Sequence, residues 1–229
     1  MINSVRNTVL SVLNKNNYGY ISPSDFNLFA KQAQMELFVG VFDEYNKTVN
    51  KENARVSGSG YADMRTPLEE CIDTFSSTAA LTNIATNTFN APLNYYMISN
   101  VLVNGRLADR VSHGTAFNML ASNFITPSAN YPIYTMEGDV LTFYPATISS
   151  SDVIVSQYIR LPRAPKWTYI QLLNGEPIFD QSASDYQDFE LPDDMEYALA
   201  QKILQYAGIS IREVQVYQYA KAEEQQQQQ

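Results

Sequence analysis

The spacing of apolar side chains changes twice along this chain of 229 residues, and that change constrains the fold more than any other feature. Near both ends, apolar residues recur every three to four positions, as they do along one face of a helix. Between residues 71 and 180 the pattern becomes short apolar runs separated by turn residues, which is typical of strands. We therefore predict an α+β fold in which the terminal helices pack together and an antiparallel, β-sandwich-like lobe is inserted between them.

The N-terminal part, residues 1–70, is predicted to be helical. A short first helix is indicated by four apolar residues on one side: Val5, Val9, Val12 and Leu13. The sequence Ser-Pro-Ser-Asp at residues 22–25 then supplies a capping serine, a proline suited to the first helical position and an acid in the first turn. A 3.6-residue apolar period follows, so we predict a second helix over residues 23–48. Residues 49–66 lose the period and are expected to form a flexible connection.

The β lobe, residues 71–180, is predicted from strand and turn signals. The clearest is Asn104-Gly105, which favours a type I′ turn and lies between predicted strands at residues 95–103 and 106–111. The other predicted elements are strands at residues 133–136, 140–145 and 153–160 and a short helical turn at residues 115–121.

The C-terminal part, residues 181–229, returns to the helical pattern and is expected to join the N-terminal helices in one domain. Pro192, followed by acids, marks a helix entrance, and Gly208 is expected to end that helix. The apolar face of this helix is formed by Met195, Leu199, Ile203 and Tyr206. A capping box at residues 210–213 predicts one more helix, and the last residues, two glutamates and five glutamines, predict a frayed tail.

The charge balance disfavours several classes of protein. The chain has 15 basic and 24 acidic side chains and a formal net charge of −9. A surface that grips nucleic acid uses clustered Lys and Arg to neutralise phosphates, so we do not expect one here. The first residues lack a secretory signal pattern, and no stretch reaches the roughly 18 apolar residues that cross a bilayer. We expect a soluble protein made in a reducing cytosol, without a membrane partner.

Residue types that carry chemistry are scarce, since the chain has one histidine and one cysteine. Catalysis by His113 would need an orienting carboxylate and a nucleophile, for which Asp109 and Ser112 are nearest in sequence. Sequence neighbours rarely form a triad, so a loop or capping histidine is the simpler interpretation. Cys71 has acids nearby, which raise a thiol pKa, and an inert cysteine is expected. A single cysteine also excludes a disulfide framework and a thiolate zinc cluster.

Seven carboxylates gather near the C-terminal helix entrance: Asp180, Asp185, Asp188, Glu190, Asp193, Asp194 and Glu196. Such a group could build a calcium site or a glycosidase pair. However, the Asp-x-Asp-x-Asp-Gly calcium loop is missing, and acids are also common in solvated loops and at helix N-termini. We therefore predict no catalytic, cofactor-binding or metal-binding residues and no cofactor. An enzyme built on Asp188 or Glu190 is kept as an alternative.

Aromatic side chains are abundant, at 12 % of the chain. Trp167 and Tyr169, which follow a predicted strand, could present a sugar-binding surface. Aromatic residues more often form core or protein–protein contacts, which is the interpretation we favour. A carbohydrate- or receptor-binding β-module is kept as a second alternative.

Four short runs occur in a recognisable order along the predicted lobe. They are Ser-Asn-Phe-Ile-Thr-Pro at 122–127, Tyr-Pro-Ile-Tyr at 131–134, Leu-Thr-Phe-Tyr-Pro at 141–145 and Tyr-Ile-Arg-Leu-Pro-Arg-Ala-Pro-Lys-Trp at 158–167. In this order the chain resembles the ring-forming head–tail connector (adaptor) proteins of short-tailed and crAss-like bacteriophages. The helix start at residues 22–26 and the run Phe-Glu-Leu-Pro at 189–192 fit this resemblance, which spans about residues 1–215.

The resemblance implies a structural virion protein at the head–tail junction, assembled in the host cytoplasm, with no catalytic residues to carry over. It implies a dodecameric homo-oligomeric ring that binds the phage portal protein and adjacent tail or ring proteins. Double-stranded DNA would pass through this ring without specific binding. The acidic balance agrees independently, because a negative channel wall repels DNA. Another virion or assembly component is the nearest alternative.

Overall fold

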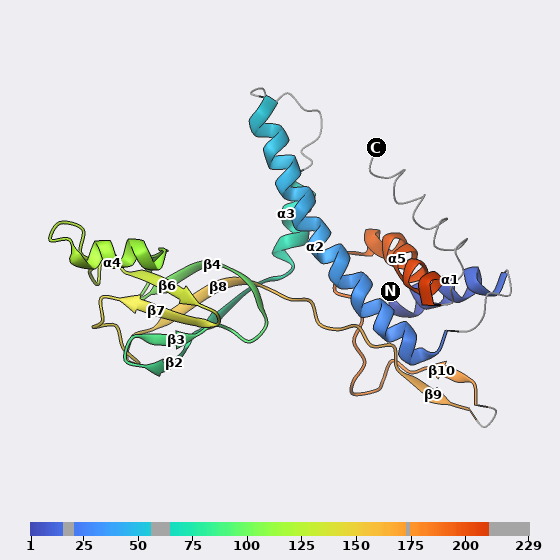
Figure 1. The fold of residues 1–229 in the computed structure, drawn as a ribbon. Helices are drawn as coiled ribbons and strands as arrows, with labels where there is room; N and C mark the ends of the chain where they lie inside the picture. The colour runs from blue at the N-terminus through green and yellow to red at the C-terminus, as the bar shows by residue number, and fades with distance from the viewer. Residues whose placement is uncertain (16–20, 56–64, 173–174, 211–229) are drawn as a thin grey trace. The chain divides into compact units, whose positions relative to one another are not determined.

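The computed structural model describes residues 1–15, 21–55, 65–172 and 175–210. The fold is α+β, as predicted, and divides into two compact units. A helical unit combines Met1–Cys71 with Pro162–Gln229, and a β lobe consists of Ile72–Leu161 (Figure 1). The predicted lobe boundary at residue 180 is therefore too late, because residues 162–180 belong with the terminal helices.

Two N-terminal helices begin the helical unit. Helix α1 spans Ile2–Lys15 and buries Val5, Val9 and Leu13 completely. Val12, which we predicted on the same buried side, is exposed instead. Helix α2 spans Pro23–Arg55 and begins as expected, with the backbone N–H of Asp25 donating to Ser22 Oγ at 3.1 Å.

Helix α2 is longer than the predicted 23–48. Residues 49–55 lack an apolar stripe, but they include Lys, Glu, Ala and Arg, whose helix propensity continues an existing helix. The connection that we expected at 49–66 is therefore helical at its start, and α3 (Arg65–Asp73) begins at its end. Residues 56–64 lie outside the described residues. The Tyr45 hydroxyl of α2 donates to Glu69 Oε1 of α3 at 3.0 Å.

The C-terminal helix closes the helical unit. A 3₁₀ turn, η1 (Asp193–Met195), follows Pro192 and leads into α5 (Glu196–Ser210). Helix α5 packs against both α1 and α2, which confirms that the terminal helices pack together (Figure 1). It continues past Gly208, where we expected it to end, because glycine permits a left-handed residue but does not impose one. The further helix predicted from residues 210–213 and the predicted tail lie outside the described residues, apart from Ser210.

The β lobe is one eight-stranded sheet in the order β1-β8-β4-β5-β6-β7-β3-β2. Its strands are β1 Ser76–Ala80, β2 Thr82–Ala85, β3 Thr88–Asn90, β4 Tyr95–Val103, β5 Arg106–Arg110, β6 Ile133–Glu137, β7 Val140–Tyr144 and β8 Ile154–Arg160. The edge strands β1 and β2 are consecutive in the chain, with only Leu81 between them. The sheet therefore curls back on itself, and it does so as a single sheet.

One pairing departs from the antiparallel sheet that we predicted. Strands β5 and β6 run parallel, with Asp109 opposite Ile133. Helix α4 (His113–Ala121) and the loop after it connect them, and a connection of this length is what parallel neighbours require. Helix α4 packs beside β6 (Figure 1).

The other predicted strands are confirmed within a residue or two. Asn104 and Gly105 have φ of 51° and 78° and join β4 to β5, as a type I′ turn requires. Strands β1, β2 and β3 were not predicted, because their Ser-, Thr-, Ala- and Asn-rich sequences show little apolar alternation.

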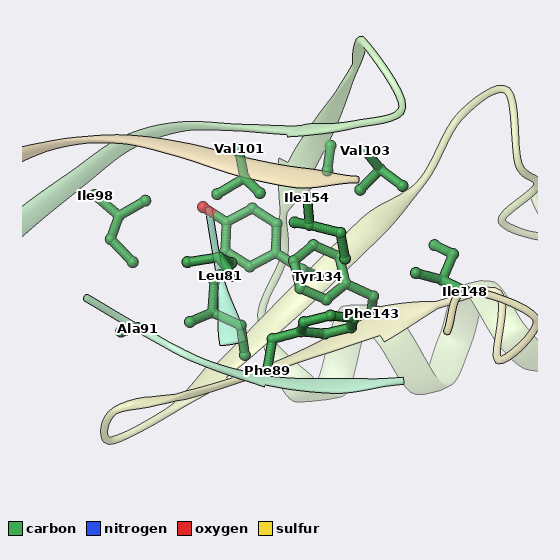
Figure 2. Packing of buried hydrophobic residues seen from close by; sticks show 12 residues of the cluster. Leu81, Phe89, Ala91, Ile98, Val101, Val103, Tyr134, Phe143, Ile148 and Ile154 are labelled. Atoms are coloured by element: carbon green, nitrogen blue, oxygen red, sulfur yellow. The ribbon is translucent and has the colours of Figure 1, made fainter. Parts of the chain in front are cut away.

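The core of the lobe is aromatic at its centre. Phe143 packs edge-on against Phe89, with ring centroids 5.5 Å apart, and lies 5.6 Å from Tyr134. Val101 of β4 and Ile154 of β8 face these rings (Figure 2). Burial raises the pKa of the Tyr134 hydroxyl above its ordinary value. All members of this buried cluster lie between residues 81 and 154, so the lobe has a hydrophobic core of its own.

Candidate functional site

His113 is the first residue of α4 and is nearly half exposed. Its Nδ1 lies 3.5 Å from Glu137 Oε1. Ser112, the nucleophile considered beside it, is the N-cap of α4, because its Oγ accepts a hydrogen bond from the backbone N–H of Thr115 at 3.2 Å. The hydroxyl of Ser112 thus stabilises the helix start, which is a structural role.

Cys71 lies buried in α3, with 6 % of its surface exposed. Burial raises the pKa of its thiol, and the nearby charge of Asp194 raises it further. The thiolate is the reactive form of cysteine, so this environment favours the less reactive, protonated thiol.

The seven carboxylates do not converge on one point. Asp185 binds Lys166 Nζ, and Glu190 Oε2 accepts the backbone N–H of Arg163 at 2.7 Å. Asp180 Oδ1 accepts the backbone N–H of Ser182 at 2.9 Å. Three further members lie in η1 or in the first turn of α5: Asp193, Asp194 and Glu196. The seventh, Asp188, is described below. Within the described ranges, no three His, Cys, Asp or Glu side chains are grouped so that they could hold a metal ion.

Asp188 binds the start of α1 from the other end of the chain. Its Oδ1 accepts the backbone N–H of Ile2 at 2.7 Å and that of Phe189 at 2.8 Å. The ammonium group of Met1 lies 3.1 Å from Oδ2. Burial alone would raise the pKa of this carboxyl, but the hydrogen bonds and the ammonium outweigh burial and hold the pKa below its ordinary value of 3.8. Asp188 therefore acts as a helix cap supplied by a distant segment.

Trp167 is the centre of the helical unit. Only 2 % of its surface is exposed, so it cannot present a ring face to a sugar, and the sugar-binding hypothesis for this residue is wrong. Its backbone N–H donates to Asn27 Oδ1 at 2.8 Å, and its Nε1 donates to Asn3 Oδ1 at 3.1 Å. The Arg6 guanidinium lies 3.8 Å from the indole centroid. These contacts join α1 and α2 to the segment that leaves the lobe.

The run 158–167, which carries part of the resemblance, is held by a buried amide that the sequence did not reveal. Gln34 of α2 is 1 % exposed. Its Nε2 donates to the backbone carbonyl of Arg163 at 2.7 Å, and its Oε1 accepts the backbone N–H of Glu190 at 3.1 Å. The prolines and the tryptophan of this run therefore lie on a fixed path along α2, which gives the run a structural role.

A β-hairpin of the helical unit exposes one apolar side. Strand β9 (Tyr169–Gln171) pairs with β10 (Pro177–Phe179), so that Ile170 lies opposite Ile178 and Tyr169 lies opposite Phe179. Tyr169 and Phe179 stack on Trp167 at 5.6 and 5.9 Å between ring centroids. Because residues alternate sides along a strand, Ile170 and Ile178 point away from this stack, and both are exposed. We call Ile170, Leu172 and Ile178 the hairpin face.

The β lobe exposes a second apolar surface on α4 and the loop after it. Phe117 is 70 % exposed and Phe124 is 98 % exposed. We define the α4 face as five exposed residues: Phe117, Leu120, Phe124, Ile125 and Tyr131. The loop is ordered by a hydrogen bond from Thr126 Oγ1 to the carbonyl of Ser122 at 2.6 Å. One feature of the sequence indicates this apolar surface: residues 111–136 contain no Asp, Glu, Lys or Arg.

The lobe also contains a pocket of about 610 Å³ beside the junction of β1 and β2. Tyr95 and Asp139 line it, and the Tyr95 hydroxyl donates to Asp139 Oδ1 at 2.9 Å. Burial, and then Asp139, raise the pKa of this tyrosine. The rest of the lining is small or apolar: Ala79, Ala80, Thr82, Asn90, Ala91, Pro92 and Leu93. Among the described residues that line the pocket, the ionisable groups are thus a carboxylate and a phenol that are hydrogen-bonded to each other.

No known family model matches the chain, and no curated protein matches it either. The described helices include none with the length and apolarity needed to cross a membrane. The hairpin face and the α4 face are two of the exposed apolar areas of the described residues, and they are the candidate functional surfaces.

Proposed function

We propose that this chain is a structural virion protein of a tailed bacteriophage, a head–tail connector (adaptor) that forms a ring between the portal and the tail. The observation that carries the proposal is the pair of exposed apolar faces, one on each unit, because such surfaces mark sites of protein association. The order of short runs that resembles connector proteins supports the same conclusion. The candidate catalytic side chains add to it, since Ser112, Asp188 and Glu190 bind backbone groups of the fold.

The proposed partners follow from this role. Copies of the chain form a homo-oligomeric ring of about twelve subunits, which binds the portal protein on one side and adjacent tail or ring proteins on the other. Double-stranded DNA passes through the ring without being bound, because a chain of net charge −9 repels phosphates. The ring is assembled in the host cytoplasm and acts at the head–tail junction of the virion.

The two alternatives from other classes have less support. The carbohydrate-binding module was based on Trp167, which is buried under Arg6, Tyr169 and Phe179. Such a module would have to use other exposed rings, such as Phe124 and Tyr131. An enzyme built on Asp188 and Glu190 would need carboxylates free to act on a substrate, whereas both accept backbone hydrogen bonds. Another virion component remains the nearest alternative, and it differs from a connector only in its partner.

The test is the mass of the protein in solution, alone and mixed with the portal ring encoded by the same genome. Native mass spectrometry or light scattering gives the number of copies directly. We expect a ring of about twelve copies bound to the portal. A chain that stays monomeric and does not bind the portal would refute the connector function. A ring that forms but ignores the portal would move the protein elsewhere in the virion.

A further inference from the structure

Strand β1 leaves one of its two sides open. It pairs with β8 in an unbroken antiparallel register, from Ser76 opposite Ile159 to Ala80 opposite Val155. On the other side of β1, no described strand continues the sheet. We call this side of β1 the open edge.

The register shows which backbone groups face the open edge. Just outside the limits of β1, the backbone N–H of Arg160 donates to the carbonyl of Phe75, and the N–H of Leu81 donates to the carbonyl of Ile154. Because hydrogen-bonded and non-hydrogen-bonded pairs alternate along an antiparallel ladder, the odd-numbered residues from 75 to 81 bind β8. The even-numbered residues therefore turn their N–H and C=O groups toward the open edge. These residues are Ser76, Thr78 and Ala80, and all three are exposed.

The pocket of about 610 Å³ adjoins this edge. Ala79 and Ala80 of β1 line it together with Ala91, and its volume is in the range of clefts that hold ligands. The buried cluster is also least covered on this side, where Leu81 and Ala91 are each 9 % exposed and Ile98 is 8 % exposed. Figure 2 shows these residues toward one end of the cluster, away from Ile148. A strand added here would cover that end of the core.

The sequence of β1 has none of the usual protection of a sheet edge. Proteins protect exposed edges with lysine or other charges, with proline, or with a bulge. Residues 74–105 contain no Asp, Glu, Lys or Arg, β1 contains no proline, and its register with β8 is regular. Such an edge is a template on which an extended peptide can add as a further strand.

The chemistry of the edge and the pocket defines the partner. Alternating N–H and C=O groups at strand spacing are matched by the backbone of another extended segment. Asp139 lines the same pocket, and no Lys or Arg is among the described residues that line it. A carboxylate in this position suits a Lys or Arg side chain of the added segment.

A second copy of this chain fits the open edge less well than a different protein does. Its own open edge would bring β1, which carries no Lys or Arg, so Asp139 would gain no cation from it. The net charge of −9 also repels another copy and attracts a basic partner. We propose that the open edge of β1 binds an extended, Lys- or Arg-bearing segment of another protein as a ninth strand of the sheet. The inference goes beyond the proposed ring, because the edge and the pocket lie within the β lobe.

Two capped peptides test the pairing on the full, unchanged chain. The first is Thr-Val-Thr-Val-Thr-Lys, which favours an extended backbone and ends in a cation. The second has the same side chains but carries methyl groups on its backbone nitrogens, so it cannot donate to β1. Fluorescence anisotropy of labelled peptides measures binding. We expect the methylated peptide to bind at least about tenfold more weakly than the first.

A pair of variants tests the same contact from the side of the protein. Ala80→Pro removes an N–H that faces the open edge, at a position of an edge strand where proline is tolerated. Ala80→Ser is the matched control, because it keeps that N–H. Circular dichroism and thermal unfolding first establish that both variants fold. We expect Ala80→Pro to weaken binding of the first peptide about fivefold or more, and Ala80→Ser to leave it unchanged.

The role of Asp139 is tested by changing the charge on both partners. Replacing the lysine of the first peptide by glutamine should weaken binding to the unchanged chain about two- to fivefold. In Asp139→Asn, the two peptides should bind equally. Equal binding to the unchanged chain would overturn the assignment of Asp139.

Three results would overturn the open edge as a site for another protein. One is equal binding of the methylated and unmethylated peptides, a comparison that does not depend on any variant folding. Another is no binding of the first peptide at millimolar concentration. The third is self-association of the chain that Ala80→Pro abolishes, which would make a second copy the occupant. A chain that binds the peptide but neither forms a ring nor binds the portal would refute the connector function and leave this inference in place.

Discussion

At the scale of single residues, the helical unit is held by polar side chains that bind backbone groups far away in sequence. Gln34 uses both ends of its amide to bind Arg163 and Glu190, and Asn27 binds both backbone groups of Trp167. A buried polar atom left without a partner costs stability, so these pairings select one arrangement of the segment against α2. The sequence contains these amides but does not show what they bind.

The lowered pKa of Asp188 predicts how the free energy of unfolding depends on pH. Because its pKa in the folded protein lies below 3.8, its contribution is fully present above that value and is lost as the pH falls through the lowered folded pKa. In Asp188→Asn this contribution is missing at every pH. We expect the variant to be less stable than the unchanged chain at pH 6, with the difference shrinking below pH 4. Urea unfolding across this pH range measures it.

A difference that stays constant from pH 6 down to pH 2 would contradict this role of Asp188. Asp25→Asn is a useful companion variant, because Asp25 lies in the first turn of α2 instead of at α1. Any general effect of removing one negative charge from an acidic chain would appear in both variants.

At the scale of elements, turns were the best predicted feature and helix ends the worst. Asn104 and Gly105 fix the β4–β5 turn by their own backbone preferences, and Asn104 also anchors the start of β8. Its Nδ2 donates to Asp152 Oδ1 at 2.7 Å, and its Oδ1 accepts the backbone N–H of Val153 at 2.9 Å. The turn therefore links the β4–β5 hairpin to the residues just before β8. The end of α2 was misjudged because a helix can continue on propensity after its apolar stripe has stopped.

Gly105 gives a prediction at this scale. Its φ of 78° is a left-handed conformation, and a Cβ there would meet no atom within 4 Å, so the cost of Gly105→Ala is conformational. We expect a loss of about 1–2 kcal/mol in the free energy of unfolding, measured by urea denaturation. Gly114→Ala is the matched control, because Gly114 lies in α4 and its Cβ also meets open space. That change should be neutral or slightly stabilising. Equal losses in both variants would contradict the argument.

At the scale of the whole molecule, the helical unit is built from both ends of the chain and the lobe is inserted between them. The two ends of the lobe meet in its own sheet, where Ser76 pairs with Ile159 and the backbone N–H of Arg160 donates to the carbonyl of Phe75 at 2.9 Å. An insertion whose ends lie together disturbs the host unit little. This is how a strand-rich lobe interrupts a helical unit.

The lobe should therefore fold without the rest of the chain. A fragment of residues 72–161 retains all eight strands and the whole buried cluster around Phe143. We expect a strand-type circular dichroism spectrum and one cooperative thermal transition. In the same fragment, Phe143→Ala should lose about 3–5 kcal/mol, which shows that the transition reports on the core. A fragment that is unfolded in buffer would mean that the lobe depends on the helical unit.

Much of the candidate site was only partly visible in the sequence. Its acids and aromatics were identified as a group, but their roles depend on contacts: Asp188 caps a helix and Trp167 is covered. The α4 face could have been found from its uncharged sequence. The hairpin face could not, because β9 and β10 are three-residue strands that give no alternation pattern. Which side of β9 is exposed depends on a tertiary contact, the stacking of Tyr169 on Trp167.

The sequence by itself determined the class of fold, most long elements and the Asn104-Gly105 turn, since each depends on interactions among residues a few positions apart. Tertiary structure alone decided which unit residues 162–180 join, that β5 and β6 run parallel, and which polar groups meet. Asp188 reaches the N–H of Ile2 across 186 positions of sequence. Contacts at such separations depend on how whole elements pack, because no local preference brings two distant segments together.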